Sequence, residues 1–502
     1  MSENRIRNSK LLKKIVSADN AAEFIKDGMV VAIGGFSPSG YPKVVPKALS
    51  DRVEKSGEKL NISLYTGSST GPEIDGEWTK AGIIKRRIPY QSNSELRSKI
   101  NDGSVKYCDM HLSQMPQYIN YSMLPKVDVA IVEAVCITEE GYIVPSTSIG
   151  NNATFIKNAS KIIVEVNEKQ PIELEGMSDI YTLKNPPNRE PIPLKHPGDR
   201  IGTPYIVCDP NKICAIVITN ISDKARGLAK ITPTSQAISD NLIGFLNKEV
   251  ESGRLPENLL PIQSGVGSVA NAVLAGLCKS NFKDLSCYTE IIQDSMLNLI
   301  KCGKAKVVSG TSISPSPEML PKFIEDIEFF KDKIILRPQE ISNNPGVARR
   351  LGVISINTAL EADIYGNVNS THVMGSKMMN GIGGSGDFAR SAYLTIFTTE
   401  SIAKKGNISS IVPMVSHVDH TDHDVMIIIT EQGVADLRGL CPRERAETII
   451  NNCAHPDYRE MLRGYFKEAI ALSGGNTPHN LEKALSWHTK FIKTGSMLGI
   501  FK

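Results

Sequence analysis

The sequence lacks the features that would assign it to several large classes of protein. No apolar run approaches the roughly eighteen residues of a membrane-spanning helix, and the N-terminal stretch is charged throughout, unlike a secretion signal. The 57 basic and 54 acidic residues are scattered, and no basic block is present that would neutralise a run of phosphates. We therefore expect a cytoplasmic protein that binds neither a membrane nor nucleic acid.

Cysteine spacing argues against two kinds of covalent or metal crosslink. The nine cysteines extend from Cys108 to Cys453, and no two form a CxxC pair. An odd count without such pairs argues against a disulfide framework and against a structural zinc site. We interpret all nine as small buried hydrophobic side chains.

What is present is the pattern of an α/β protein. Hydrophobic residues make up 41% and charged residues 22% of a chain long enough for at least two domains. Short apolar runs that end in turns and precede helical periodicity are typical of parallel strands joined by helices. We predict two tandem open α/β domains, residues 1–225 and 226–502, with the ligand site in the cleft between them. In the first domain we expect strands over residues 29–33, 62–65, 127–132, 161–166 and 213–218.

The stretch around Glu290 has the pattern of a helix start. Thr289 is a suitable N-cap, and apolar residues from Ile292 to Ile300 follow at helical spacing. Glu290 is thereby predicted in the first helical turn, where an acidic side chain gains about 0.3–1 kcal/mol from the helix dipole. On this pattern alone, Glu290 is an ordinary first-turn acid.

Two glycine-rich segments are candidates for ligand contact. Residues 265–270 have the form GxGxxA after an apolar run, which fits a dinucleotide turn, tight helix packing, or a backbone approached by a pantetheine arm. Residues 381–386 contain four glycines, which fits either a flexible turn or a nest of N–H groups that stabilises an oxyanion. No GK followed by Ser or Thr occurs, so nucleoside triphosphate chemistry has no support.

Residues 417–424, HVDHTDHD, contain six side chains of metal-ligating type. Their spacing matches neither the helical HExxH pair nor a zinc finger, and a loop held by hydrogen bonds fits equally well. We predict that the protein requires no metal.

Several long strings occur in a fixed order along almost the whole chain. They include GGFSPSGYPK from Gly34, PIQSGVGSVANAV from Pro261, YTEIIQD from Tyr288, RPQEISNNP from Arg337, INTALEADIYGNVNSTHVMG from Ile356, NGIGGSGDFAR from Asn380 and TEQGVADLRGL from Thr430. Read together, these strings resemble the acetyl-CoA hydrolase/transferase family of class I coenzyme A transferases, in particular its succinyl-CoA:acetate branch.

The resemblance implies a role for each matching residue. The catalytic nucleophile falls on Glu290, and the active-site amide and the oxyanion glycine fall on Asn343 and Gly384. The loop that contacts coenzyme A falls on Gly265, Val266, Gly267, Ser268 and Val269, with Leu360 and Lys404 beside the same ligand. Lys404 is equally compatible with a solvated surface lysine, and Leu360 with a core residue.

The implied reaction is ping-pong transfer of coenzyme A between short carboxylic acids through covalent glutamyl intermediates. Coenzyme A would be a substrate, and no permanently bound cofactor is expected. Succinyl-CoA with acetate is the expected pair, followed by propionate with succinate. A hydrolase that uses the same residues and a non-catalytic coenzyme A-binding protein remain alternatives. We expect a homodimer, and a second carboxylate bound by Lys43, Arg86, Arg87 or Arg97. Residues 35–40 fit either the lining of an acyl pocket or a glycine-rich turn that packs against the first strand.

Overall fold

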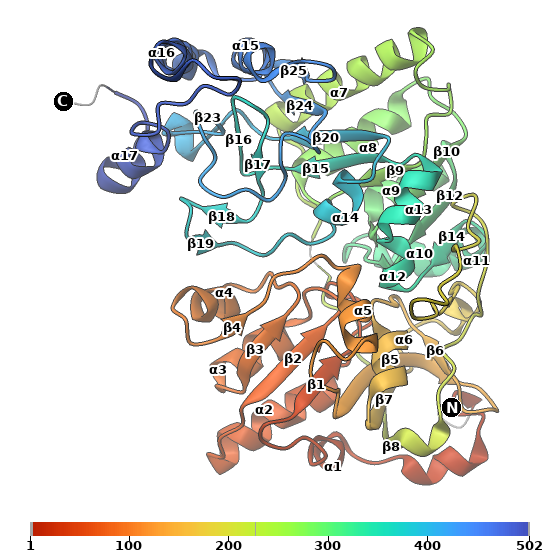
Figure 1. Cartoon of the computed structure of the whole chain (residues 1–502). Helices are drawn as coiled ribbons and strands as arrows, with labels where there is room; N and C mark the ends of the chain where they lie inside the picture. The colour runs from red at the N-terminus through yellow and green to blue at the C-terminus, as the bar shows by residue number, and fades with distance from the viewer. Residues whose placement is uncertain (1–3, 226, 500–502) are drawn as a thin grey trace. The chain divides into compact units, whose positions relative to one another are not determined.

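A computed structural model describes residues 4–225 and 227–499 (Figure 1). The chain forms two compact units. Unit 1 contains the described residues up to Gly227 together with residues 286–300 and 305–351, and unit 2 contains residues 228–285, 301–304 and 352–499. The first passage between units lies beside the predicted boundary near residue 225. The division into domains 1–225 and 226–502 stays a prediction, because the two compact units are not continuous in sequence and residues 286–300 and 305–351 belong to unit 1.

Unit 1 is built on a sheet whose main strands are all parallel, in agreement with the α/β prediction. All five strands expected from the apolar runs are present. The central strand β5 is buried over its whole length, because helices and loops cover both faces of a parallel sheet. The sheet order is β4 (Lys106–Tyr107), β3 (Ile84–Ile88), β2 (Ile62–Thr66), β1 (Val30–Ile33), β5 (Val129–Ile137), β7 (Lys161–Asn167) and β8 (Ile213–Thr219), and β6 (Ile143–Pro145) pairs antiparallel with β5.

Helices of unit 1 pack their apolar faces on this sheet. In α2, Val45, Leu49 and Val53 join one buried cluster with residues of β1 and β2. None of the described helices in either unit is long and apolar enough to cross a membrane. The helices of the first part of unit 1 are α1 (Ala18–Ala22), α2 (Val44–Ser56), α3 (Glu77–Lys80), α4 (Ser94–Asn101), α5 (Gln114–Asn120) and α6 (Asn152–Asn158), with short helical turns η2 (Ser9–Lys14), η3 (Pro72–Gly76), η4 (Ile172–Leu174) and η5 (Pro210–Lys212).

The later part of unit 1 is joined to the first by main-chain hydrogen bonds. Ile149 N–H donates to Thr311 O over 2.9 Å, and Asp179 N–H donates to Leu336 O over 2.7 Å. These bonds explain why residues 305–351 belong to unit 1. Its elements are β11 (Ile291–Ile292) parallel to β13 (Ser312–Ile313), β12 (Ala305–Gly310) parallel to β14 (Ile334–Leu336), and helices α10 (Leu320–Glu325), α11 (Ile327–Lys331), α12 (Gln339–Ser342) and α13 (Pro345–Leu351). β10 (Leu285–Tyr288) and α9 (Asp294–Lys301) flank β11.

Unit 2 is also built from parallel strands and helices. Its parallel strands are β9 (Ile262–Ser264), β15 (Ile354–Thr358), β20 (Leu394–Thr398) and β24 (Ile427–Thr430), with β25 (Gly433–Asp436) antiparallel. Its helices are α7 (Pro233–Glu251), α8 (Ser268–Lys279), α14 (Ser385–Ala389), α15 (Pro442–Asn452), α16 (Pro456–Ser473) and α17 (Ser486–Thr494). Short strands form smaller sheets: β16 (Glu361–Asp363), β17 (Val368–Asn369) and β23 (Ile411–Val412); β18 (His372–Val373) and β19 (Lys377–Met378); and β21 (Ile402–Ala403) and β22 (Ile408–Ser409), which flank the turn η6 (Lys404–Gly406).

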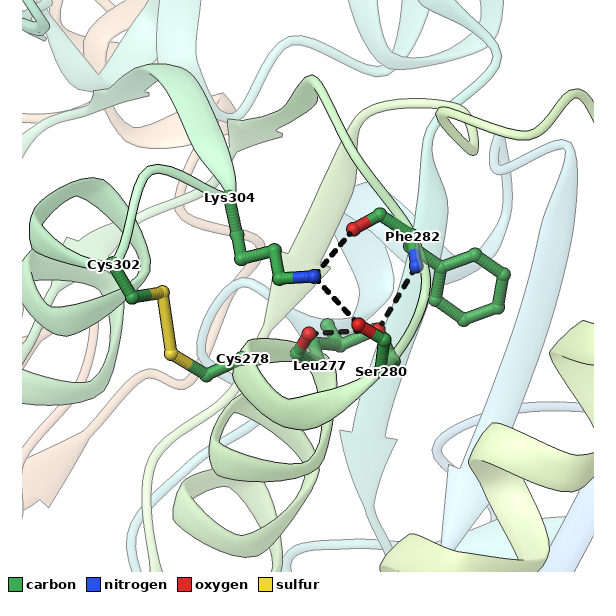
Figure 2. The surroundings of a disulfide bond; sticks show 6 residues. All are labelled: Leu277, Cys278, Ser280, Phe282, Cys302 and Lys304. Atoms are coloured by element: carbon green, nitrogen blue, oxygen red, sulfur yellow. Dashed lines mark hydrogen bonds between the residues drawn. A yellow bond between two sulfur atoms is a disulfide. The ribbon is translucent and has the colours of Figure 1, made fainter.

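A disulfide in unit 2 corrects the interpretation of two cysteines. Cys278, in the last turn of α8, is bonded to Cys302 (Figure 2). Lys304 holds the two segments together, because its ammonium donates to Ser280 O over 2.6 Å and to Phe282 O over 3.1 Å. The prediction that all nine cysteines are unpaired was wrong, since folding rather than spacing brings these two together. Among the others, Cys136, Cys287 and Cys453 are buried, whereas Cys441 is exposed.

Candidate active site

Glu290 lies in a bend between two strands. It follows β10 and precedes β11, and α9 begins only at Asp294. The predicted first-turn position was therefore wrong, as was the helix-dipole argument attached to it. The reason is non-local: Ile291 and Ile292 pair with β13, and that pairing overrides the helical spacing of the apolar residues.

The main chain at Glu290 is fixed on both sides. Thr289 N–H donates to Ser309 O over 2.8 Å, and Thr311 N–H donates to Glu290 O over 2.8 Å. Gly310 lies directly against this carbonyl, because a Cβ atom there would come within 3.0 Å of Glu290 O. A residue larger than glycine at position 310 would push the strand away from Glu290. The half-buried side chain of Glu290 thus extends from a main chain that is hydrogen-bonded on both sides.

Asn343 lies beside Glu290. Its Nδ2 donates to Glu290 Oε2 over 3.1 Å. Asn343 is fully buried and follows the last residue of α12. An amide N–H that bonds to a carboxylate stabilises the ionised form, which is the form that can act as a nucleophile.

Three contacts hold α12 in place. The Tyr288 hydroxyl donates to Ile341 O, Gln339 N–H donates to Gly150 O over 2.9 Å, and Gln339 Nε2 donates to Leu112 O over 2.8 Å. Tyr288 ends β10, two residues before Glu290. The same short segment therefore carries Glu290 and anchors the helix that presents Asn343.

A buried ion pair fixes the chain immediately before α12. Arg337 bonds to Asp179, donates from Nε to Ser309 Oγ over 2.7 Å, and donates from Nη2 to Pro197 O over 3.0 Å. Both charged side chains are fully buried, and burial lowers the pKa of Arg337. Pro197 lies in a loop that also contributes the buried side chain of Leu194, so this proline-rich segment is tied to the core. No local pattern around Asp179 predicts this ion pair.

Glycines allow three loops of unit 1 to meet close to α12. A Cβ atom on Gly67 would come within 2.6 Å of Gly35 O and 3.2 Å of Gln339 Oε1, and one on Gly150 would come within 2.7 Å of Gly35 O. Within the described part of the chain, Gln339 Oε1 and Asn151 Oδ1 are buried without a hydrogen-bond partner. Such unsatisfied polar atoms are rare in folded proteins.

Two of the four cations considered for a second carboxylate have structural partners. Lys43 is buried and bonds to Glu133 over 2.5 Å and to Asp223 over 2.8 Å. Arg87 is buried and donates from Nε to Asp75 Oδ1 over 2.9 Å. Burial makes an unpaired charge costly, so these two cations are committed to their partners. Arg86 and Arg97 are only half-buried.

Every residue assigned to coenzyme A belongs to unit 2. Gly265 N–H donates to Ile356 O over 3.1 Å, and Gly267 precedes α8 with a φ of +121°, a conformation that favours glycine. Val266 is 56% exposed, so the loop presents its backbone and an apolar side chain to solvent. Leu360 is 38% exposed, which excludes its interpretation as a core residue, and Lys404 is exposed.

Gly384 immediately precedes α14, and hydrogen-bonding side chains stabilise the turn that contains it. Ser385 Oγ donates to Ile382 O over 2.8 Å and lies 3.2 Å from Nε2 of the buried His420. His420 belongs to the His/Asp segment, and its main-chain N–H and C=O pair with Val368. One residue of this segment therefore supports the glycine-rich turn.

The rest of the His/Asp segment is a hydrogen-bonded loop. Asp419 accepts from Ser370 N–H over 2.7 Å and from Thr371 Oγ1 over 2.9 Å, and the rings of His372 and His417 lie 3.8 Å apart. Burial and the neighbouring His417 lower the pKa of His372. Across residues 4–225 and 227–499, no three His, Cys, Asp or Glu side chains are arranged to hold a metal ion.

Comparison with known proteins assigns the chain to a family. Residues 1–218 match the N-terminal domain of acetyl-CoA hydrolase/transferase, and residues 320–466 match its C-terminal domain. The chain belongs to the acetyl-CoA hydrolase/transferase family. This family member is 76% identical over 497 residues to the succinyl-CoA:acetate CoA-transferase of Clostridium kluyveri, a match that covers 99% of this chain and 92% of that protein.

Other members of the acetyl-CoA hydrolase/transferase family are more distant but match over a similar length. The propanoyl-CoA:succinate CoA transferase of Escherichia coli is 45% identical over 96% of this chain and 99% of its own length. The acetyl-CoA hydrolase of Schizosaccharomyces pombe is 43% identical over 98% of both chains. Among solved structures, RipA from Yersinia pestis shares the fold, with a TM-score of 0.70 at 23% identity, over 91% of this chain and 97% of its own.

Proposed function

We propose that this protein transfers coenzyme A between short-chain carboxylic acids, with succinyl-CoA and acetate as its preferred pair. The observation that carries the proposal is the Glu290 carboxylate held 3.1 Å from the Asn343 amide at the position where the family places its nucleophile. The preference for succinyl-CoA and acetate rests on the 76% identity to the Clostridium kluyveri enzyme. Propionate with succinate is second, by likeness to the Escherichia coli enzyme.

In the proposed reaction, Glu290 attacks the thioester carbonyl of the acyl-CoA and expels coenzyme A as a thiolate. The product on the enzyme is a mixed anhydride between the acyl group and Glu290. The thiolate then attacks the glutamyl carbonyl, which releases the free carboxylate and leaves a glutamyl-CoA thioester. An incoming carboxylate reverses both steps. The energy of the thioester is thereby conserved, because water takes no part.

Each attack passes through a tetrahedral oxyanion, and we assign its stabilisation to the Asn343 amide and the Gly384 N–H. One preorganised donor of this kind contributes about 2.7–4 kcal/mol to the transition state. We assign coenzyme A binding to the loop Gly265–Val269 with Leu360 and Lys404. The exposure of Val266, Leu360 and Lys404 supports their part of the assignment, since a ligand has to reach them, whereas the side chain of Val269 is buried.

We propose that the loop of residues 35–40 lines the acyl pocket; at Gly35 itself this loop packs tightly against Gly67 and Gly150. For a dicarboxylate, we propose Arg86 or Arg97 as the cation, because both are less buried than Lys43 and Arg87. Replacing each by Met and comparing KM for succinate with KM for acetate tests them: the residue that binds the second carboxylate raises only the KM for succinate.

The decisive test is mass spectrometry of protein incubated with succinyl-CoA and then digested. We expect a coenzyme A adduct on the peptide that contains Glu290. Glu290→Gln should lose both the adduct and the activity, whereas Glu325→Gln, which changes an exposed glutamate at the end of α10, should keep both. Full activity in Glu290→Gln would exclude Glu290 as the nucleophile.

The acetyl-CoA hydrolases of fungi, 41–43% identical, support hydrolysis as the second candidate function. In that reaction water attacks the covalent intermediate. The two functions differ in one measurement, which is the rate of thioester loss with and without added acetate. Strict dependence on acetate supports transfer, and an equal rate without acetate supports hydrolysis.

We further propose that the protein acts as a homodimer in the cytoplasm with acyl-CoA and small carboxylates as its only ligands. Light scattering of the purified full chain should give twice the monomer mass. A monomer at micromolar concentration would contradict the proposed assembly.

A further inference from the structure

A residue that the sequence pattern did not single out forms a hydrogen bond with the Asn343 amide. Ser342 Oγ donates to Asn343 Oδ1 over 2.8 Å, and Asn343 Nδ2 donates to Glu290 Oε2 over 3.1 Å. Ser342 and Asn343 are both fully buried. The three side chains form a chain of hydrogen bonds in one direction, from hydroxyl to amide to carboxylate.

The two ends of a side-chain amide have nearly the same shape but opposite hydrogen-bonding roles. If the Asn343 amide rotated by half a turn, its oxygen would face the oxygen of Glu290. The proton of the Ser342 hydroxyl would then lose its acceptor inside a buried site. Ser342 therefore favours the orientation that points N–H at Glu290.

This bias matters most while Glu290 is covalently modified. An ionised Glu290 attracts the amide N–H by its own charge. An anhydride or thioester at Glu290 has no full negative charge, and that attraction weakens at the stage when the next oxyanion has to form. The hydrogen bond from Ser342 does not depend on the charge of Glu290, so it holds the amide ready between the two chemical steps.

We propose that Ser342 is a positioning residue of the transfer reaction, which acts by orienting the Asn343 amide toward the carbonyl of Glu290. The proposal rests on the proposed role of Glu290 as the covalent nucleophile. Ser342 touches neither the substrate nor the reacting atoms in this scheme. Its effect on the rate passes entirely through Asn343.

A double-mutant cycle tests this dependence. Ser342→Ala should lower kcat roughly tenfold with an unchanged KM for the acyl-CoA, as expected for loss of one buried hydrogen bond that is needed in the transition state. In an Asn343→Ala background, the same substitution should change kcat by less than about twofold, because the amide to be oriented is gone. Full activity of Ser342→Ala, or equal losses in both backgrounds, would overturn the proposal.

A matched control separates positioning from general loss of stability. Ser239 is also a fully buried serine whose hydroxyl donates to a carbonyl, Ala272 O, over 2.9 Å, and it lies in α7. Ser239→Ala should keep the wild-type kcat. Ser342→Thr keeps the hydroxyl and should restore most of the rate lost in Ser342→Ala. Similar losses in all three variants would mean that the effect is structural and would overturn the proposal.

The adduct on Glu290 distinguishes failure of this inference from failure of the proposed function. Wild-type protein that forms the coenzyme A adduct, combined with equal Ser342→Ala losses in both backgrounds, refutes only the positioning role. Wild-type protein without the adduct refutes the covalent mechanism and the positioning role together. With the adduct present, slower adduct formation in Ser342→Ala and an unchanged rate in Ser239→Ala support the inference.

Discussion

Replacing Arg337 by methionine should destabilise unit 1 by leaving a buried anion without its cation. The Asp179 carboxylate accepts from the N–H groups of Ile201 and Gly202 over 2.9 and 2.6 Å, but those bonds carry no neutralising charge. Removal of one partner from a buried ion pair costs about 3–5 kcal/mol. At roughly 2 °C per kcal/mol for a large domain, the melting temperature should fall by about 6–10 °C.

A second substitution should recover part of that loss. Asp179→Asn removes the charge and keeps an oxygen for the bonds from Ile201 and Gly202, so Arg337→Met with Asp179→Asn should melt at a higher temperature than Arg337→Met alone. Thermal unfolding followed by circular dichroism measures this order. Hydrogen exchange of the peptide that contains Asn343 should rise in Arg337→Met, because Arg337 precedes α12.

The surface pair of Arg463 and Glu460 supplies the control, since both side chains are largely exposed. Arg463→Met should leave the melting temperature nearly unchanged, as exposed ion pairs contribute little. If Arg337→Met also melts like the wild type, or if Asp179→Asn adds to its loss, the argument from an uncompensated buried charge is refuted.

Three further outcomes are expected. Burial raises the pKa of Glu340 from 4.5 to about 7, so the stability that its protonated form contributes is complete below pH 4.5 and is lost as the pH rises to about 7. Glu340→Gln should remove this dependence of the free energy of unfolding on pH. Parallel curves of unfolding free energy against pH for the wild type and the variant would contradict this assignment. The Cys278–Cys302 disulfide closes a loop with a sequence separation of 24, worth about 3 kcal/mol, so dithiothreitol should lower the melting temperature of the wild type but not of the Cys278→Ala, Cys302→Ala double variant. Prolonged incubation with EDTA should leave transfer activity unchanged, and a loss restored by zinc or manganese would contradict the prediction that no metal is required.

The strands of the first sheet could be predicted because their signal is local. A strand buried on both faces is a continuous apolar run, and β5 and β7 are such runs. The bend at Glu290 could not be predicted in this way, because it depends on the pairing of Ile291 and Ile292 with a strand some twenty residues further along the chain. The local spacing of apolar residues favours a helix at Glu290, but pairing with β13 makes the segment a strand.

The site residues also differ in whether a local sequence signal identifies them. Glu290, Asn343 and Gly384 were assigned from family strings, and the hydrogen bond between Glu290 and Asn343 agrees with that pairing. Ser342 and Asp179 carry no local signal, since a serine beside an asparagine and an aspartate in a loop are common. Their roles depend on which atoms the fold places next to them. The Cys278–Cys302 bond escaped prediction for the same reason.

The order of segments in unit 1 has a consequence for synthesis on the ribosome. The sheet from β1 to β8 is complete when residue 219 has been made. Residues 286–300 and 305–351 of the same unit are made only after residues 228–285 of unit 2. The late segments carry Glu290 and Asn343. Unit 1 is therefore incomplete until residue 351 has been made, and a fragment that stops at residue 227 would lack the main-chain hydrogen bonds that Ile149 and Asp179 make to the later segments. Unit 2 includes the C-terminal helices α15, α16 and α17, so its last segments are made after those of unit 1.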